Sequence, residues 1–294
     1  MRIVSGFLDA TPPFDFAQSY RFLEKFRPMA GEQRLSEKRI VKALMVGGET
    51  IGFRLSGAGS TDTSGIGYEL LSNKPLRDAE KQYVADRISF FLSLKDDLNP
   101  FYAVAKNDKV FYPIVERMRG LHHVKFLTFV EIACWSIMAQ HAPIAVARRM
   151  KDSFVEKLGD IIVIDGMPVR AFPDQTRLSG VTLELLYAII KNKRRSEYLS
   201  WLISALKDVD EDFLRTADYD EAQAWLKQIK GIGDWSSTFI LFRGLGRMER
   251  LGSKSQPIIK RMAQVYGPEM TLDEAMKIYG EWTGYWSLYL RSSE

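Results

Sequence analysis

The pattern of hydrophobic and polar positions changes near residue 76. In residues 15–26 (DFAQSYRFLEKF), apolar positions recur at helical spacing behind Asp15, whose side chain suits a helix N-cap. The runs RIVKALMVGG, ETIGFRLSG and GIGYELLS then alternate or carry β-branched residues, and Gly and Ser clusters typical of turns separate them. These patterns predict an antiparallel sheet with a helix packed on one face.

From about Leu76 onward the apolar positions follow helical periods, and the pattern indicates only one further strand, IIVIDG at 161–166. The sequence therefore predicts an α+β protein. A small antiparallel sheet domain with a helix spans residues 1–97, and a mostly helical domain spans residues 98–294, with room for two helical subdomains and a cleft between them. The helices expected around the sites discussed below cover residues 125–139, 142–158, 181–191, 194–208, 219–228, 234–243, 255–266 and 283–290.

Composition narrows the class of protein only a little. The 294 residues are 46% hydrophobic and 27% charged, and the net charge of +4 permits a nucleic-acid partner without requiring one. The single cysteine, Cys134, lies in an apolar run, which excludes an internal disulfide and favours a reducing compartment. Three histidines and one cysteine do not form a zinc-ligand cluster. With neither a signal peptide nor an apolar run of about 18 residues, we expect a soluble cytoplasmic protein with no membrane partner.

The stretch WLKQIKGIGDWSSTFILF carries the most specific local pattern. It predicts an amphipathic helix, a short turn containing Gly231 and Gly233, and a second helix that opens near Asp234, an N-cap candidate. The backbone N–H groups at the start of the second helix can bind a DNA phosphate without a basic side chain. The contact would involve Gly231, Gly233, Asp234 and Trp235.

A resemblance to a known family extends this pattern. IKGIGDWSSTFILFRGLGR resembles the helix-hairpin-helix of the DNA glycosylase superfamily, and most of all the 3-methyladenine DNA glycosylase II (AlkA) type. TPPFDFAQSYRFL resembles the opening of that family, and FVEIACWSIMAQHAP resembles its helix that ends in a Gln-bearing wedge loop. With RRSEYLSWL and EWTGYWS in the expected order, the resemblance covers essentially the whole chain.

The resemblance implies hydrolysis of the N-glycosidic bond of a damaged base flipped out of duplex DNA. Trp235 occupies the position at which lyase-capable relatives carry a nucleophilic Lys, which implies a monofunctional enzyme. Trp235, Phe239 and Phe22 match aromatic positions of the base pocket, and packing in the core is the alternative for Phe22 and Phe239. Gln140 and His141 match the wedge, although His141 could equally be a solvated turn residue.

The catalytic carboxylate is where the chain departs from the family. Counting without a gap from Trp235, the Asp of the family falls on Ser255, whose hydroxyl cannot supply a full negative charge to the sugar. Three explanations compete. Ser255 suffices for cationic lesions such as N3-methyladenine, another carboxylate (Asp234 or Glu249) replaces the missing one, or the protein binds alkylation damage without cutting.

The remaining expectations concern partners and the chain's end. The family implies duplex DNA with alkylated bases as partner, a monomer, and no organic cofactor. It also suggests a monovalent cation or Mg²⁺ held by backbone carbonyls around Lys227, Ile229 and Ile232. The basic run KNKRR at 191–195 is either a solvated helix junction or a patch that faces DNA. Trp282, Tyr285 and Trp286 are either core residues or substitutes for a pocket Trp of the family.

Overall fold

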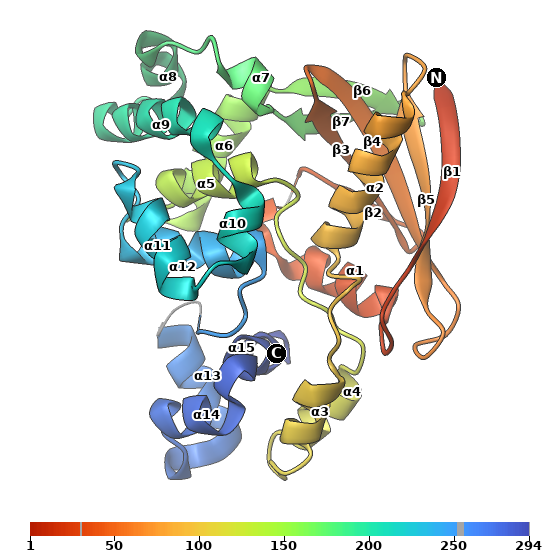
Figure 1. Cartoon of the computed structure of the whole chain (residues 1–294), viewed down its shortest axis with the longest axis vertical. Coiled ribbons are helices and arrows are strands. Elements are labelled where there is room, and N and C mark those ends of the chain that lie inside the picture. The colour runs from red at the N-terminus through yellow and green to blue at the C-terminus, as the bar shows by residue number, and fades with distance from the viewer. Residues whose placement is uncertain (30, 252–255, 294) are drawn as a thin grey trace.

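A seven-stranded sheet forms one side of the molecule (Figure 1). The computed structural model describes residues 1–29, 31–251 and 256–293. Six strands lie in the order β1-β5-β4-β3-β7-β6, and β2 pairs with β3. All pairs are antiparallel except β3 with β7. The strands span Arg2–Asp9 (β1), Arg34–Ser36 (β2), Arg39–Val46 (β3), Glu49–Ala58 (β4), Gly65–Ser72 (β5), Asp160–Ile164 (β6) and Met167–Phe172 (β7).

The β6–β7 hairpin joins this sheet from the middle of the helical part of the chain. The sequence predicted a strand at 161–166, which corresponds to β6, but it did not predict β7. Pro168 is unusual inside a strand. Pro168 lies opposite Val163 of β6, while β7 meets β3 only at Ala171 and Phe172. The proline is therefore outside the ladder with β3, where a missing N–H would cost a hydrogen bond. The sheet thus draws on residues 160–172 as well as on the first 72 residues.

The larger hydrophobic core lies between this sheet and the helices that cover it. Phe53 and Leu70 of the sheet pack in one cluster with Ile88 of α2 (Asp78–Phe91) and with Ile132 of α5 (Phe129–Met138). The helices of this part are α1 (Phe16–Lys25), α2 (Asp78–Phe91), α5 (Phe129–Met138), α6 (Ile144–Leu158), α7 (Gln175–Leu178), α8 (Leu183–Ile190), α9 (Lys193–Ala205), α10 (Glu211–Thr216), α11 (Tyr219–Gln228) and α12 (Asp234–Phe239).

A second core joins two segments that are far apart in the sequence. Helices α3 (Asn99–Ala105) and α4 (Tyr112–Arg117) pack with α13 (Gln256–Tyr266), α14 (Leu272–Tyr279) and α15 (Thr283–Ser292), as the lower part of Figure 1 shows. Phe101, Phe111 and Trp286 are fully buried in this cluster. Phe22 of α1 packs against both cores, which places it at their junction. The α+β class predicted from the sequence is confirmed.

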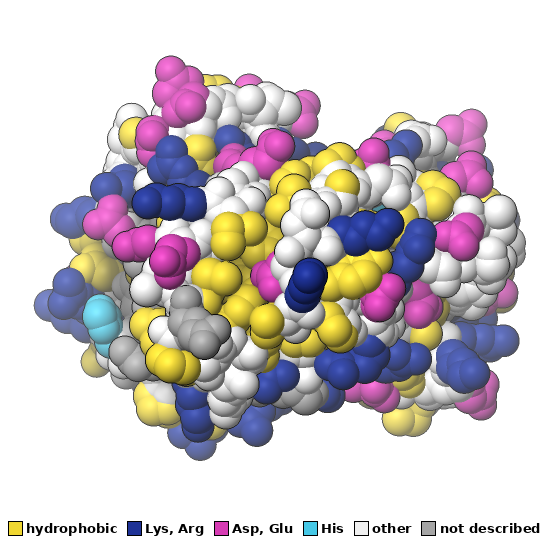
Figure 2. Space-filling view, turned by 90° about the horizontal axis from the view of Figure 1, so that it is seen from below, with side chains coloured by type: hydrophobic (Ala, Val, Ile, Leu, Met, Phe, Trp, Pro, Cys, Tyr) yellow, Lys and Arg dark blue, Asp and Glu magenta, His cyan; other side chains and the backbone are white. Residues whose placement is uncertain are grey.

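The surface seen from below in Figure 2 carries charges of both signs around a central group of hydrophobic side chains. The net charge of +4 is therefore not gathered into one continuous basic surface on this face. Over the ranges 1–29, 31–251 and 256–293, no helix has the length and apolar character needed to cross a membrane.

Candidate nucleic-acid interface

Helices α11 and α12 form the predicted hairpin. At the end of α11 the backbone N–H of Ile229 donates to the carbonyl of Leu226. In the turn that follows, the N–H of Ile232 donates to the carbonyl of Ile229 at 2.9 Å. The first intrahelical bond of α12 then runs from Ser237 N–H to Gly233 O at 2.9 Å. The N–H groups that precede Ser237 in α12 have no acceptor inside the helix, so they are available to a ligand.

The two glycines of the turn serve different needs. Gly231 has a φ of +99°, and a Cβ at this position would lie 2.5 Å from the ring of Tyr198. Both the backbone conformation and the packing therefore require glycine here. Gly233 has an extended φ of −103°, and a Cβ there would meet nothing within 4 Å. The space beside Gly233 is open, which suits the close approach of another backbone.

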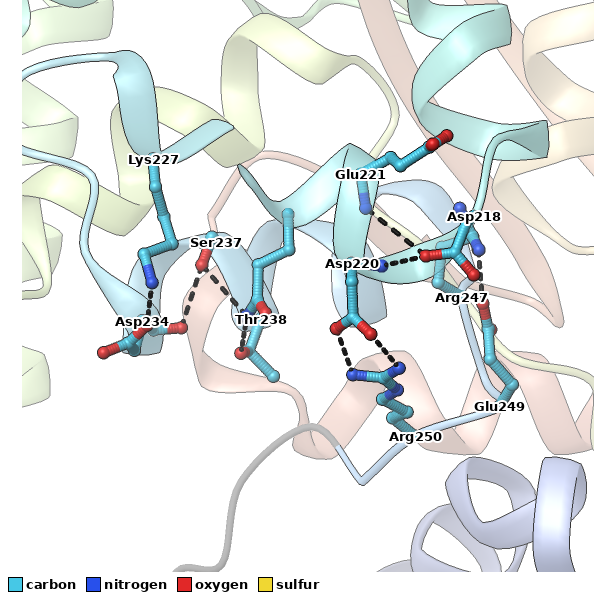
Figure 3. A network of polar contacts seen from close by, with 11 residues as sticks. Asp218, Asp220, Glu221, Lys227, Asp234, Ser237, Thr238, Arg247, Glu249 and Arg250 are labelled. Carbon is cyan, nitrogen blue, oxygen red and sulfur yellow. Dashed lines mark hydrogen bonds and ion pairs between the residues drawn. The ribbon is translucent and has the colours of Figure 1, made fainter. Parts of the chain in front are cut away.

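Asp234 does not cap α12, contrary to the expectation from the sequence. The N-cap residue is Gly233, and no side chain makes a capping hydrogen bond. Asp234 is the first residue of the helix, and its carboxylate accepts a hydrogen bond from Nζ of Lys227 at 2.6 Å (Figure 3). An acidic residue in the first turn is favourable beside the positive end of the helix dipole, and its pairing with α11 fastens the two arms of the hairpin.

Gln140 braces the turn from the end of α5. Its Nε2 donates to the carbonyl of Gly231 at 2.6 Å and to Oγ of Ser236 at 2.9 Å, and its own carbonyl accepts from Nη2 of Arg195 at 2.5 Å. The neighbouring His141 is exposed and has a φ of +47°, a conformation uncommon outside glycine. The side chain of Gln140 is thus held by the hairpin, and His141 is the residue at the tip of the turn.

The predicted pocket aromatics lie at the two ends of a row of rings. Trp235 is 44% exposed and stacks on Phe239, with centroids 5.2 Å apart and planes 9° from parallel. Phe239 meets Phe126 edge to face at 6.4 Å, Phe126 meets Phe26 at 6.0 Å, and Phe26 stacks on Phe22 at 5.1 Å. We call these five residues the aromatic row. It connects the exposed face of the hairpin with the junction of the two cores.

Ser255 lies outside the described residues. The two carboxylates considered as its substitutes are both engaged in ion pairs. Asp234 is bound by Lys227, and Glu249 accepts from Nε of Arg247 at 2.5 Å (Figure 3). Each carboxylate is therefore neutralised by a positive partner.

The basic run 191–195 forms the junction between α8 and α9. Lys191 ends α8 with a φ of +54°, and the side chain of Asn192 caps α9 by accepting from the amide of Arg195. Nε of Arg194 donates to the hydroxyl of Tyr198 at 2.6 Å, and Tyr198 in turn packs on Gly231. The run is thus a helix junction, and because it lies beside the hairpin the alternative of a patch that faces DNA stays open.

The predicted cation site consists of backbone carbonyls at the end of α11, and one of them already accepts a hydrogen bond. Ile229 O accepts from the amide of Ile232, and its second lone pair remains for a cation. In the part of the chain that the structure describes, no group of three or more His, Cys, Asp or Glu side chains could hold a metal ion. A cation at this hairpin would therefore depend mainly on backbone carbonyls such as that of Ile229.

The aromatic residues near the end of the chain belong to the second core. Trp286 is fully buried and donates from Nε1 to the hydroxyl of Tyr266 at 3.0 Å. Tyr285 is 2% exposed and its hydroxyl donates to Asp96. The ring of Trp282 lies 6.3 Å from that of Phe101 in the same cluster. Trp286 and Tyr285 are therefore core residues, and Trp282 is a partly buried residue that packs against the same cluster.

The sequence did not point to Arg243, which lies beside the aromatic row, or to Phe126, which is a member of it. Arg243 places its guanidinium carbon 4.4 Å from the ring centre of Phe26 and 5.0 Å from that of Phe22. Phe126 joins the two ends of the row, and its amide donates to the carbonyl of Arg243. The spacing of Trp235, Phe239 and Arg243, four residues apart each time, was the available signal for Arg243.

No protein-family model matches the chain. A DNA-3-methyladenine glycosylase from Bacillus subtilis (strain 168) is 26% identical over 228 residues, which cover 75% of each protein. Among solved structures, the 3-methyladenine DNA-glycosylase from Archaeoglobus fulgidus matches with a TM-score of 0.76 at 16% identity over 97% of both chains.

A second solved structure extends the comparison to an enzyme bound to DNA. The 8-oxoguanine glycosylase/lyase from Clostridium acetobutylicum, in complex with double-stranded DNA, matches with a TM-score of 0.68 at 15% identity. The match covers 99% of this chain and 97% of that one. The relatives and structural neighbours are thus 3-methyladenine and 8-oxoguanine DNA glycosylases, and the chain has the fold of the helix-hairpin-helix DNA glycosylases that its sequence resembles.

Proposed function

We propose that the protein is a monofunctional DNA glycosylase that removes alkylated bases from duplex DNA in base excision repair. The observation that carries the proposal is the hairpin, which presents the exposed, stacked Trp235 beside an open turn within a fold shared with DNA glycosylases along nearly its whole length. Such an enzyme acts inside the cell, where the DNA is, and we propose that it acts as a monomer.

The hairpin is the proposed DNA grip. A phosphate oxygen would approach beside Gly233 and accept from the N–H groups at the start of α12, while Gly231 fixes the turn. A cation on the carbonyls around Lys227, Ile229 and Ile232 would add positive charge to the same contact. These interactions involve no base edge, so they position the protein on any sequence.

The turn after α5 is the proposed wedge. A flipped base leaves a gap in the duplex that a side chain must fill. His141 is exposed at the tip of the turn and can stack on bases, whereas Gln140 is bound to the hairpin. We therefore assign insertion into the duplex to His141. Gln140 would hold the wedge turn against the hairpin through its hydrogen bonds.

Trp235 and Phe239 form the proposed stacking wall for the extruded base. The faces of aromatic rings attract positive charge by roughly 0.5–2 kcal/mol per contact, which favours a cationic alkylated base. Trp235 carries no amine, so no Schiff base forms with the sugar. The bond between C1′ and the base nitrogen breaks, the base leaves with the bonding electrons, and water adds to C1′ and loses a proton to the solvent.

Catalysis must then proceed with little help from a carboxylate. Both Asp234 and Glu249 are neutralised by ion pairs, which supports the explanation that Ser255 occupies the catalytic position without a substitute. A cationic base is already a good leaving group, so extrusion and positioning of water would supply the remaining acceleration. The alternative, a protein that binds alkylation damage without cutting, shares the hairpin and differs only in this step.

Release of methylated bases from duplex DNA tests the proposal. Purified protein is incubated with methylated duplex DNA, and free bases are measured by chromatography. We expect release by the native protein, loss of release in Trp235→Ala, and faster release in Ser255→Asp. No release by the native protein together with tight binding of alkylated duplex would favour the binding protein instead.

A substitution at the next residue tests whether position 255 is the catalytic one. Gln256→Asp places a carboxylate one residue later, at the first residue of α13. If Ser255 is the catalytic position, only Ser255→Asp accelerates release. Acceleration by Gln256→Asp alone would move the catalytic position by one residue and contradict the assignment of Ser255.

A further inference from the structure

The side chain of Arg243 is buried without the partners that a guanidinium needs. It is 6% exposed, and within the described part of the chain its Nε and Nη2 have no hydrogen-bond acceptor. Burying donors without acceptors is costly, and burying a charge is more costly still. The faces of Phe22 and Phe26 compensate for part of this cost through cation–π contacts, but they accept none of the N–H groups.

Arg243 lies at the inner end of the helix face that carries the stacking wall. Trp235, Phe239 and Arg243 are four residues apart along α12 and the π-helical turn that continues it (Ile240–Gly244), so they share one side. Exposure decreases inward along this face, from the exposed Trp235 through the half-buried Phe239 to the buried Arg243. The guanidinium also contacts Phe22, which packs against both cores.

The charge on Arg243 persists at neutral pH. Burial, together with the smaller effect of the nearby positive charge of Arg291, lowers the pKa of Arg243 to about 9. The group is therefore a cation with free donors throughout the physiological range. A neutral apolar side chain would cost less free energy at this site, which points to a use for the donors.

We propose that Arg243 is a specificity-determining residue whose guanidinium donates to the acceptor edge of an extruded guanine-type base. This inference rests on the proposed function, because it concerns the base that the pocket takes. Guanine presents two adjacent acceptors, O6 and N7, and Arg is the side chain whose fork of donors matches that pair. Adenine presents N7 beside the N6 amino group, so one donor of Arg243 would face another donor.

Methylated purines differ in which of the two acceptors, O6 and N7, stays available to Arg243. N3-methylguanine keeps both O6 and N7, N7-methylguanine keeps only O6, and N3-methyladenine keeps only N7 beside an amino group. All three carry positive charge when attached to the sugar, so each experiences the same repulsion from Arg243. Only the guanine bases offset that repulsion with a carbonyl. The pocket should therefore favour N3-methylguanine, then N7-methylguanine, over N3-methyladenine.

The first test compares bases released from the same methylated duplex. Competition in one reaction gives the ratio of kcat/KM for N3-methylguanine and N3-methyladenine. Arg243→Met keeps the length of the side chain and removes the donors, and we expect it to lower that ratio by about 5- to 100-fold. An unchanged ratio in folded Arg243→Met would overturn the proposal.

Two further variants make the comparison sharper. Arg119→Met removes an arginine that also stacks on a ring, that of Tyr102, in the second helical part, and should leave the ratio unchanged. Arg243→Lys keeps the charge but loses the fork, so the ratio should fall to a value between those of the native protein and Arg243→Met. If Arg243→Met does not fold, a native ratio in Arg243→Lys overturns the proposal on its own.

A binding measurement separates this inference from the proposed function. Duplexes carry either hypoxanthine, which has O6 and N7, or unsubstituted purine, which lacks O6, opposite thymine. Anisotropy of labelled duplex should show tighter binding of the hypoxanthine duplex by the native protein and equal binding by Arg243→Met. Failure to release any base would contradict the proposed function alone. Equal binding of the two duplexes by the native protein would contradict the role of Arg243.

Discussion

At the scale of single residues, the two glycines of the hairpin turn can be tested against each other. Gly231 has a positive φ and packs against Tyr198, whereas Gly233 has ordinary extended backbone and open space beside it. Stability therefore depends on Gly231, and the proposed approach of DNA depends on Gly233. The two residues are two positions apart, so each serves as the control for the other.

Gly231→Ala should destabilise the protein by about 1–3 kcal/mol, because alanine is strained at positive φ and its Cβ would overlap the Tyr198 ring. Gly233→Ala should leave the free energy of unfolding within about 0.5 kcal/mol of the native value. It should nevertheless weaken DNA binding, since a methyl group would stand where the phosphate approaches. Urea unfolding and duplex-binding assays measure the two effects. Equal DNA affinity of Gly233→Ala and native protein would argue against a backbone contact at this turn.

The hydrophobic pattern predicted the positions of Trp235 and Phe239 but not the burial of Arg243. The periodicity of WSSTFILFR placed Trp235 and Phe239 on one face, and the stacking of their rings agrees with that spacing. Burial of Arg243 was not foreseen, because arginine is normally exposed and only tertiary packing brings Phe22 and Phe26 against it.

At the scale of elements, the turn after α5 and the hairpin form one unit through Gln140. The family resemblance grouped Gln140 and His141 as a wedge, and the structure gives the two side chains different surroundings. Sequence spacing cannot distinguish them, because the contact from Gln140 to Gly231 joins residues 91 positions apart. The β7 strand was not predicted either, and its pairing with β3 joins residues that are far apart in the sequence.

Gln140→Ala should remove two hydrogen bonds to the hairpin and leave the Gly231 carbonyl without that donor. We expect a loss of about 1–3 kcal/mol in stability, together with weaker binding of undamaged duplex. His141→Ala should leave both quantities near native and reduce the rate of base release. Thermal unfolding and single-turnover release compare the variants. A large loss of stability in His141→Ala would mean that this residue supports the turn and does not serve as a wedge.

At the scale of the whole molecule, a buried charged cluster fastens the sheet to the helices. Nζ of Lys42 in β3 binds Glu32 at 3.0 Å, and Nζ of Lys151 in α6 binds both Glu32 and, at 3.0 Å, Glu131 of α5. Burial alone would raise the pKa of Glu131, but Lys151 and Lys42 outweigh burial and hold it at about 2. Burial and the charge of Glu131 raise the pKa of Glu32 to about 7.

These two shifts act on stability in different pH ranges. The contribution of Glu131 is present above its unfolded pKa near 4.5 and is lost as the pH falls toward 2. Glu32 favours the protonated form in the folded state, so its contribution declines as the pH rises from 4.5 to 7. Together, the contributions of Glu131 and Glu32 to the free energy of unfolding are therefore largest at mildly acidic pH.

Glu131→Gln should cost about 3–5 kcal/mol at pH 7, because it leaves Lys151 with less negative charge in a buried site. The variant should also lose less additional stability than the native protein between pH 4.5 and 3. Urea unfolding at pH 7, 4.5 and 3 measures both effects, with Glu156→Gln, at an exposed position of α6, as the control. Parallel pH profiles for Glu131→Gln and the native protein would contradict the assigned pKa.

The pairing of α3 and α4 with α13–α15 has a consequence for the order of folding. Residues 99–117 leave the ribosome early, yet the helices that complete their core are made after more than a hundred further residues. Phe101 and Phe111 therefore lack their partners in this core until Trp286 and its neighbours are synthesised. The second core is therefore the last part of the molecule whose residues have all been synthesised.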